Sequence, residues 1–228
     1  MLLASVPKIV SLALPSFVWN IPTQEKTVFL TFDDGPIPET TPWVLSVLRD
    51  FNAKACFFCV GENVQKYNDL YQQIIDEGHS VGNHTFNHLV GWKTPVETYI
   101  ENIHKAKSYI DSTLFRPPHG LIRNSQFNLI KDKYKVIMWN VLSMDYDKTI
   151  SPEQCYRNVI DHVKQGSIVV FHDSIKAWEN LRFALPKTLE YLSNEGYSFS
   201  AIKASQFERS KQGSFENRKS FSILKKRA

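Results

Sequence analysis

Two adjacent carboxylates, Asp33 and Asp34, end an apolar run that reads TVFLTFDDGP over residues 27–36. Like charges side by side repel each other, and burying either one is costly unless another group compensates it. A single Asp before Gly35 would suffice for a turn. The pair therefore indicates a site that contains a cation, a shared proton or an arginine.

A pair of histidines offers ligands for such a cation. His84 and His88 lie four residues apart in GNHTFNHL, and if this stretch begins a helix, both imidazoles lie on one face. With one carboxylate of the Asp33-Asp34 pair they form a two-nitrogen, one-oxygen set that is common for catalytic zinc. The other carboxylate would then accept a proton from a water on the metal. We expect a divalent cation here, zinc first, with cobalt or nickel as alternatives.

The segment FRPPHG, residues 115–120, supplies a candidate partner for the free carboxylate. A guanidinium binds a carboxylate bidentately, so Arg116 near Asp33 would keep that side chain ionised and oriented. The two prolines that follow are rigid and present the backbone N–H of His119, a candidate donor to an oxyanion. Taken alone, Arg116 is equally typical of a surface turn.

A general acid is expected from SIVVFHDS, residues 167–174. His172 follows a buried strand directly, and Asp145 in the segment MWNVLSMDYD could hold it as an imidazolium. A protonated imidazole suits the protonation of a leaving amine or alkoxide. A purely structural histidine is the competing interpretation.

These residues must be positioned by regular elements. Short apolar runs alternate with amphipathic stretches, which predicts an α/β fold with about seven parallel strands, and a closed or nearly closed barrel fits this repeat better than an open sheet. The candidate site residues all follow strand ends, which share one rim in such folds. The candidate strands are 27–32, 54–60, 79–83, 113–116, 135–140, 167–171 and 197–200, and the candidate helices lie near 41–50, 63–77, 95–111, 123–132, 151–164 and 178–194.

The bulk composition is that of a globular protein with one sizeable core. The chain has 228 residues and a net charge of +4, but residues 201–228 carry eight basic and two acidic residues, so the excess is in a basic C-terminal tail. No nucleic-acid partner is therefore expected. Residues 1–25 are predicted to pack on the domain formed by residues 26–200. Because Pro7, Lys8 and Pro15 interrupt the apolar N-terminus, it is a poor export signal. No membrane span is expected, and a cytoplasmic location is predicted, with an extracytoplasmic one as the alternative.

Together, five segments resemble the motifs of the polysaccharide deacetylase family, also called the NodB-homology or chitin deacetylase-like carbohydrate esterases. The segments are TFDDGP, HTFNH, RPPHG, DY at 145–146 and VFH at 170–172, in the family's order. The resemblance implies a distorted (β/α) barrel and metal-dependent removal of acetyl groups from N- or O-acetylated oligo- or polysaccharides. By position it implies Asp34, His84 and His88 as metal ligands, Asp33 as general base oriented by Arg116, His119 as an oxyanion donor, and His172, supported by Asp145, as general acid.

Some positions differ from the family pattern. His119 stands where the family usually has Tyr or Trp, and Leu142 stands where an acidic residue is common. Tyr146 replaces the usual Trp, and Val170 the usual Leu. These residues surround the expected acetyl pocket and leave the metal ligands unchanged, so they bear on which saccharide is bound.

Two other classes of protein fit part of the pattern. A non-haem iron oxygenase also uses two histidines and one carboxylate, but it would leave Asp33, Arg116 and His172 without a role. A non-catalytic carbohydrate-binding relic of the same fold would not need the complete catalytic set. The sequence gives neither the saccharide nor the oligomeric state.

Overall fold

The central strand of the protein is the one that ends in the carboxylate pair. The computed structural model describes residues 4–207, and in it β1 (Thr27–Asp33) pairs in parallel with β2 (Cys56–Cys59) on one side and β7 (Ile168–His172) on the other. All seven residues of β1 are buried. Such a continuous buried run is typical of a parallel strand that is covered on both faces.

The sheet confirms the predicted fold class. Along its path the strands follow the order β5-β4-β3-β2-β1-β7-β6, and β8 pairs with the beginning of β1. Every pairing between named strands is parallel. The path curls into the distorted barrel that the family resemblance implies. The remaining strands are β3 (Ser80–Asn83), β4 (Leu114–Phe115), β5 (Lys135–Val136), β6 (Val141–Leu142) and β8 (Ser198–Phe199).

The predicted strand 135–140 differs in an informative way, because it contains only the short β5, and a second short strand, β6, follows directly after it. Just after β5, the Ile137 N–H donates to Phe115 O at 2.9 Å, and just after β6, the Ser143 N–H donates to Val170 O at 3.1 Å. The run 135–142 thus pairs with β4 at its start and with β7 at its end. It joins the two edges of the curled sheet.

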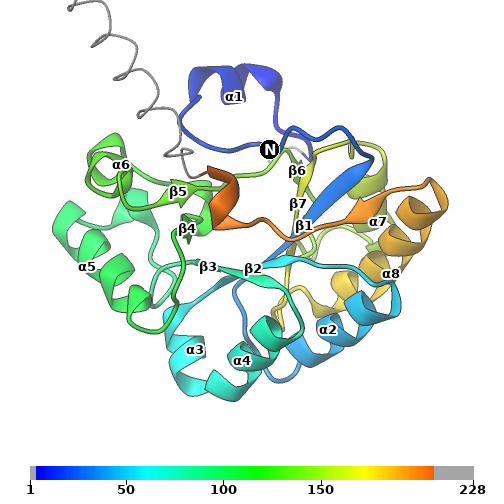
Figure 1. Ribbon diagram of the computed structural model, residues 1–228, viewed down its shortest axis with the longest axis horizontal. Helices are drawn as coiled ribbons and strands as arrows, with labels where there is room; N and C mark the ends of the chain where they lie inside the picture. Colours follow the sequence, from blue (N-terminus) through cyan, green and yellow to red (C-terminus); the bar gives the residue numbers. More distant parts are fainter. Residues whose placement is uncertain (1–3, 208–228) are drawn as a thin grey trace, which may run out of the picture.

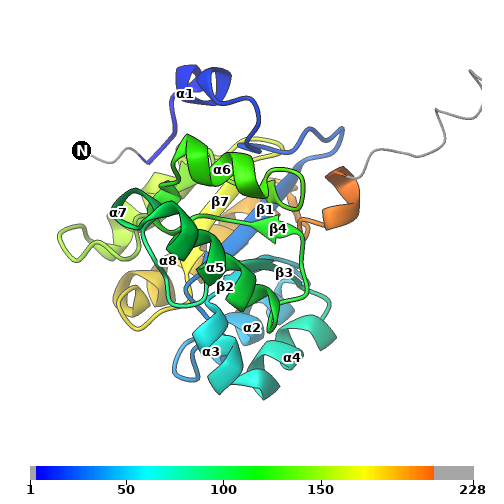
Figure 2. The same cartoon turned by 90° about the vertical axis from the view of Figure 1, so that its left-hand side faces the viewer.

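Helices cover the outside of this sheet, as Figures 1 and 2 show. The predicted helix 63–77 is two helices that meet at Tyr67, and α7 begins as expected, with the Ser151 hydroxyl accepting the Gln154 N–H at 3.1 Å and Pro152 in the first turn. The helices are α1 (Lys8–Ala13), α2 (Thr41–Asp50), α3 (Gly61–Lys66), α4 (Asn68–Asp76), α5 (Val96–Lys107), α6 (Asn124–Ile130), α7 (Pro152–Ile160) and α8 (Trp178–Asn194), with 3-10 turns η1 (Gly91–Lys93), η2 (Pro118–Gly120) and η3 (Ala204–Phe207).

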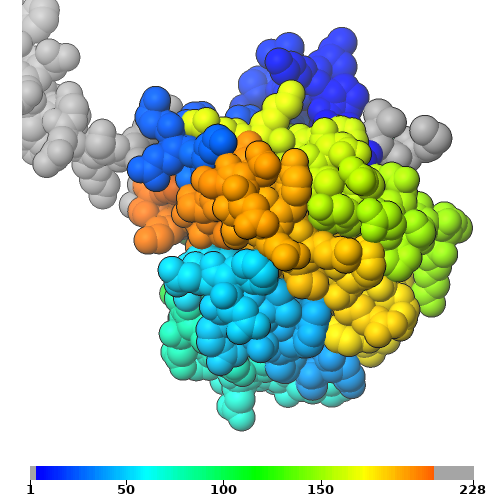
Figure 3. All heavy atoms as spheres, turned by 90° about the vertical axis from the view of Figure 1, so that its right-hand side faces the viewer, coloured from blue at the N-terminus to red at the C-terminus, as the bar shows by residue number. Residues whose placement is uncertain are grey.

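The segment before β1 lies against the joining run 135–142. The Val18 N–H donates to Val136 O at 2.9 Å, and the Met138 N–H donates back to Val18 O at 2.7 Å. Figure 3 shows the first described residues, which include α1, in dark blue at one end of the molecule, next to the face formed by α2, α7 and α8. Most of the expected basic tail, from residue 208 onward, lies outside the described residues. Between residues 4 and 207, no helix has the length and apolar character that a bilayer crossing requires.

Candidate active site

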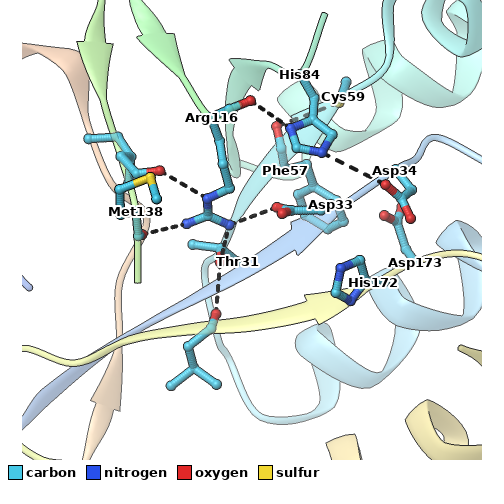
Figure 4. Close-up of polar contacts among 12 residues, drawn as sticks. Thr31, Asp33, Asp34, Phe57, Cys59, His84, Arg116, Met138, His172 and Asp173 are labelled. Atoms are coloured by element: carbon cyan, nitrogen blue, oxygen red, sulfur yellow. Dashed lines mark hydrogen bonds and ion pairs between the residues drawn. The ribbon is translucent and has the colours of Figure 1, made fainter. Parts of the chain in front are cut away.

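The predicted site residues come together at the carboxyl ends of the parallel strands (Figure 4). Asp33 ends β1, His84 follows β3 directly, and Arg116 follows β4 directly. His172 ends β7, and Asp145 stands three residues after β6. The strand ends of a parallel sheet form one rim, and so five separate segments contribute to a single site.

A candidate metal centre lies between the first and third strands. One ligand atom from each of Asp34, His84 and His88 lies within 4.8 Å of the other two. Asp34 Oδ1 is 3.2 Å from His88 Nε2 and 3.8 Å from His84 Nε2. No helix holds the two histidines, because the chain from His84 to Val90 is a loop. Instead, Thr85 and His88 adopt positive φ values of 66° and 58°, which turn both imidazoles toward Asp34.

The donor set fits a divalent cation. Asp34 Oδ1 is buried and has no aligned hydrogen-bond donor among the described residues, although it faces two imidazole nitrogens. His84 Nδ1 lies 2.8 Å from Arg116 O, which fixes the ring with Nε2 toward the centre. Burial lowers the pKa of His84 to about 4, so its ring is neutral and can donate a lone pair. Burial opposes the ionisation of Asp34, but the His88 contact and the neighbouring imidazoles outweigh it and hold its pKa well below the usual range.

Asp33, the other carboxylate, turns away from this centre to a buried arginine. Arg116 Nη1 donates to Asp33 Oδ1 at 2.7 Å, and it also donates to the Thr31 hydroxyl at 2.8 Å. The expected bidentate geometry is absent from this pair, because Nε and Nη2 donate to the carbonyls of Ile137 and Met138, each at 3.0 Å. The guanidinium is fully buried, yet every one of its nitrogens has an acceptor. The pair is therefore compensated and rigid.

His172 is paired with Asp145 on the opposite side of the site. Its Nδ1 lies 2.7 Å from Asp145 Oδ1, and its backbone N–H donates to Asp145 Oδ2, also at 2.7 Å. Burial alone would lower the pKa of His172, but the charge and hydrogen bond of Asp145, with further contributions from Asp34 and Asp33, raise it to about 9. The ring is therefore an imidazolium at neutral pH, as a general acid requires.

One pocket of about 280 Å³ is lined by both carboxylates of the pair and by the histidines of the site, whereas Arg116 and Asp145 lie behind its wall. His119 lies at its edge with a positive φ of 59°, and its ring centre is 5.0 Å from that of His88. The His119 N–H makes no hydrogen bond within residues 4–207. Apolar atoms of the wall come from Trp139, Leu142, Tyr146 and Val170, the last three at positions that differ from the family pattern.

Sequence reasoning missed Asp173, which is fully buried next to His172. Its carboxylate accepts the Gly35 N–H at 3.1 Å and contacts the Thr41 hydroxyl at 2.5 Å, so it anchors the loop that carries Asp34. A side-chain carbon at Gly35 would lie 2.0 Å from Asp173 Oδ2, and only glycine permits this approach. Burial, and the charge of Asp34, raise the pKa of Asp173 to about 8. The one signal in the sequence was a second charged residue directly after a buried apolar strand.

Known proteins match both the chain and its fold. The polysaccharide deacetylase family model matches residues 20–135. A peptidoglycan-N-acetylglucosamine deacetylase of Bacillus cereus is 35% identical over 81% of this chain and 90% of its own length. A peptidoglycan-N-acetylmuramic acid deacetylase of Bacillus subtilis, PdaA, is 30% identical over 82% of this chain and 74% of its own.

Solved structures agree with these matches. A crystal structure of a peptidoglycan N-acetylglucosamine deacetylase with a bound naphthalenyl N-hydroxybenzamide has a TM-score of 0.79 at 29% identity, over 86% of this chain and 95% of that one. Another structure is that of a CE4 family pseudoenzyme mutant with restored enzymatic activity. It has a TM-score of 0.71 at 26% identity and covers 81% of this chain and 68% of its own. The chain therefore belongs to the polysaccharide deacetylase family of hydrolases, as its five motifs predict.

Proposed function

We propose that this protein removes acetyl groups from N-acetylated sugars of the peptidoglycan type, with a divalent cation, zinc first, held by Asp34, His84 and His88. One observation carries the proposal: two adjacent carboxylates have separate partners. Asp33 is paired with a buried guanidinium, whereas Asp34 faces two imidazoles. This division is what a hydrolase needs when one carboxylate binds a metal and its neighbour acts as a base. The names of the relatives support the substrate class.

The first half of the reaction belongs to Asp33. A bound divalent cation would polarise the acyl oxygen and lower the pKa of a water ligand to about 7. Asp33 then accepts the proton of the attacking water, and the hydrogen bond from Arg116 holds this carboxylate in place. Because the base is held by a buried charge rather than by solvent, it needs no reorganisation when the proton moves.

The second half belongs to His172, which protonates the leaving nitrogen across the pocket. Asp145 holds the ring orientation and favours its charged form. The unpaired N–H of His119 donates to the acyl oxygen as negative charge develops there. The apolar wall that includes Trp139 and Leu142 takes the methyl of the acetyl group and excludes water from it.

The non-catalytic alternative has a specific observation behind it, because the structural neighbours include a CE4 family pseudoenzyme, one mutant of which has restored activity. Here, however, the proposed catalytic residues are all present and paired. Asp34 faces His84 and His88, Arg116 contacts Asp33, and Asp145 contacts His172. O-deacetylation would use the same residues, since an alkoxide leaving group also needs a general acid. The predicted cytoplasmic location stays a prediction.

Acetate release tests the proposal. The purified protein is stripped with a chelator, reloaded with zinc, cobalt or nickel, and assayed on N-acetylglucosamine oligomers, peptidoglycan fragments and acetylated xylan. We expect metal-dependent release, with amide-linked acetyl groups preferred. Asp33→Asn should lower turnover by a factor of roughly 10² or more, the usual contribution of a general base. It should leave zinc affinity within twofold of wild type, because Asp33 is not among the ligands.

Two results would contradict these assignments. Near-wild-type acetate release by Asp33→Asn would remove the base assignment. Glycan binding by the reloaded protein without any acetate release would favour the non-catalytic alternative. An anaerobic repeat separates the hydrolase from an iron oxygenase, since hydrolysis needs no oxygen.

A further inference from the structure

An exposed indole lies in the loop that follows His84 and His88. Trp92, in the turn η1, has 58% of its surface exposed. The turn belongs to the connection between β3 and α5, at the same end of the sheet as the metal ligands. Single exposed apolar side chains are common on protein surfaces, so the exposure alone carries no conclusion. The way in which this turn is held is what distinguishes it.

The turn is fixed from beneath by a buried amide. Gln126 is fully buried, and its Nε2 donates to Gly91 O at 2.9 Å and to Thr94 O at 3.2 Å, on either side of Trp92. Its Oε1 accepts the Arg123 N–H at 2.9 Å. A side-chain carbon at Gly91 would lie 2.5 Å from Leu121 O, so the turn sits directly on the neighbouring loop. A buried polar side chain with all its groups engaged specifies one conformation.

The indole itself is held at its polar edge. Trp92 Nε1 donates to Ile122 O at 3.1 Å, and the Arg123 guanidinium donates to the carbonyl of Trp92. The ring is therefore prevented from folding back onto the surface, and its apolar face stays open to solvent. A rigid exposed aromatic ring loses little conformational entropy when it binds a ligand.

The two chain segments that hold Trp92 each include a residue that lines the pocket. Trp92 follows His88 by four residues, and its hydrogen-bond partner Ile122 follows His119 by three. His88 and His119 line the pocket, and their ring centres are 5.0 Å apart. Trp92 thus lies on the His88–His119 side of the pocket but outside it, where a polymer must continue beyond the residue that is being deacetylated.

We propose that Trp92 binds the substrate chain by stacking its exposed face on the pyranose ring of a sugar next to the one deacetylated. A pyranose presents an apolar C–H face and a polar edge, which suits an indole whose own N–H is already satisfied. Arg123, exposed beside the ring, can donate to the sugar hydroxyls. This inference rests on the proposed function, because it takes a saccharide polymer as the ligand.

Chain-length dependence tests the stacking. For an N-acetylglucosamine tetramer, Trp92→Ala should raise KM five- to tenfold and leave kcat within twofold, whereas turnover of the N-acetylglucosamine monomer should not change. Trp92→Phe should restore most of the affinity, because an aromatic face remains. Leu129→Ala is the matched control: Leu129 also has 58% of its surface exposed, on α6, and its replacement should change neither constant.

A binding measurement separates this inference from the proposed function. In the Asp33→Asn background, calorimetric titration with the tetramer should give a Kd five- to tenfold weaker when Trp92→Ala is added. If wild type released no acetate but this loss of affinity appeared, the proposed function would fail and the stacking site would stand. Equal tetramer affinity with and without Trp92 would overturn the stacking site. A change in oligomeric state without a change in affinity would overturn it too, and would make Trp92 a contact between copies of the chain.

Discussion

At the residue scale, the site separates charges that the sequence places side by side. Asp33 and Asp34 are neighbours, but Asp34 has a φ of 84°, which sends its side chain toward the imidazoles while Asp33 remains in the strand beside Arg116. Each carboxylate thereby has its own positive or metal-binding partner. The same logic recurs at His172, whose charged form exists because Asp145 lies against it.

The Asp145–His172 pair predicts a pH dependence. A general acid acts only while protonated, and the pKa of His172 is raised to about 9, so the rate should fall as pH rises through about 9. Asp145→Asn removes the charge that favours the imidazolium. The high-pH limb should then move down toward the ordinary histidine value of about 6.5, so the loss of turnover should grow from about fourfold at pH 7 to roughly 10²-fold near pH 9.

The kcat–pH profiles of wild type and Asp145→Asn check this expectation. Asp147→Asn, at a half-buried aspartate two residues along that contacts Thr149 rather than His172, is the matched control and should keep the wild-type limb. Coincident high-pH limbs for wild type and Asp145→Asn would show that His172 is not the acid.

At the element scale, loops rather than strands aim the ligands, and the loops are held by buried polar contacts. Asp173, directly after β7, accepts the Gly35 N–H in the loop after β1 and contacts the Thr41 hydroxyl at the start of α2. Asn83 and Thr85 brace the loop that carries the two histidines. Such contacts orient metal ligands from outside the ligand shell, and their loss typically weakens metal affinity 10- to 100-fold.

Asp173 therefore has a predicted effect on metal binding. Asp173→Ala leaves the Gly35 N–H without an acceptor and should weaken zinc affinity 10- to 100-fold in competition with a chelator. Asp173→Asn keeps an oxygen for Gly35 and a polar group for Thr41, so its affinity should be closer to wild type. His79→Ala, which removes the acceptor of the Ala55 N–H at the other end of the sheet, is a control for simple destabilisation. Equal zinc affinity in Asp173→Ala and wild type would contradict the anchoring role.

Some features of the fold and of the site could be predicted from the sequence, and others could not. Strand ends, and therefore the shared rim, follow from apolar runs that stop at polar residues, as at Asp33 and His172. The loop conformation of His84 and His88 could not be predicted from the sequence. It depends on a positive φ at Thr85, and a threonine does not indicate such a backbone conformation. The division of 135–142 was missed for a related reason: two-residue strands have no periodicity, and only their partners define them.

At the scale of the whole molecule, the N-terminal segment is connected to Asp33, the proposed base. Val18 pairs with the chain at Val136 and Met138. The carbonyls of Ile137 and Met138 hold Arg116, and Arg116 holds Asp33. A disturbance at Val18 should therefore reach the base through backbone contacts.

Val18→Pro tests this connection by removing the N–H that donates to Val136 O. The lost bond and the unpaired carbonyl cost about 2 kcal/mol, which for a domain of this size corresponds to a fall in Tm of roughly 4–8 °C. Acetate release, measured well below Tm, should also decrease. Leu12→Ala, at a side chain on α1 with 78% of its surface exposed, should change neither quantity. A normal rate in Val18→Pro with a lowered Tm would show that the segment stabilises the fold without reaching Asp33.

Arg116 takes its acceptors from β1 and from the stretch between β5 and β6. Because that stretch pairs with β4 and β7 at once, the guanidinium receives its full set of acceptors only when both sides of the sheet have assembled. During refolding from denaturant, helical signal should therefore recover ahead of turnover. The rate at which acetate release returns would then report the rate at which the two sides of the sheet assemble.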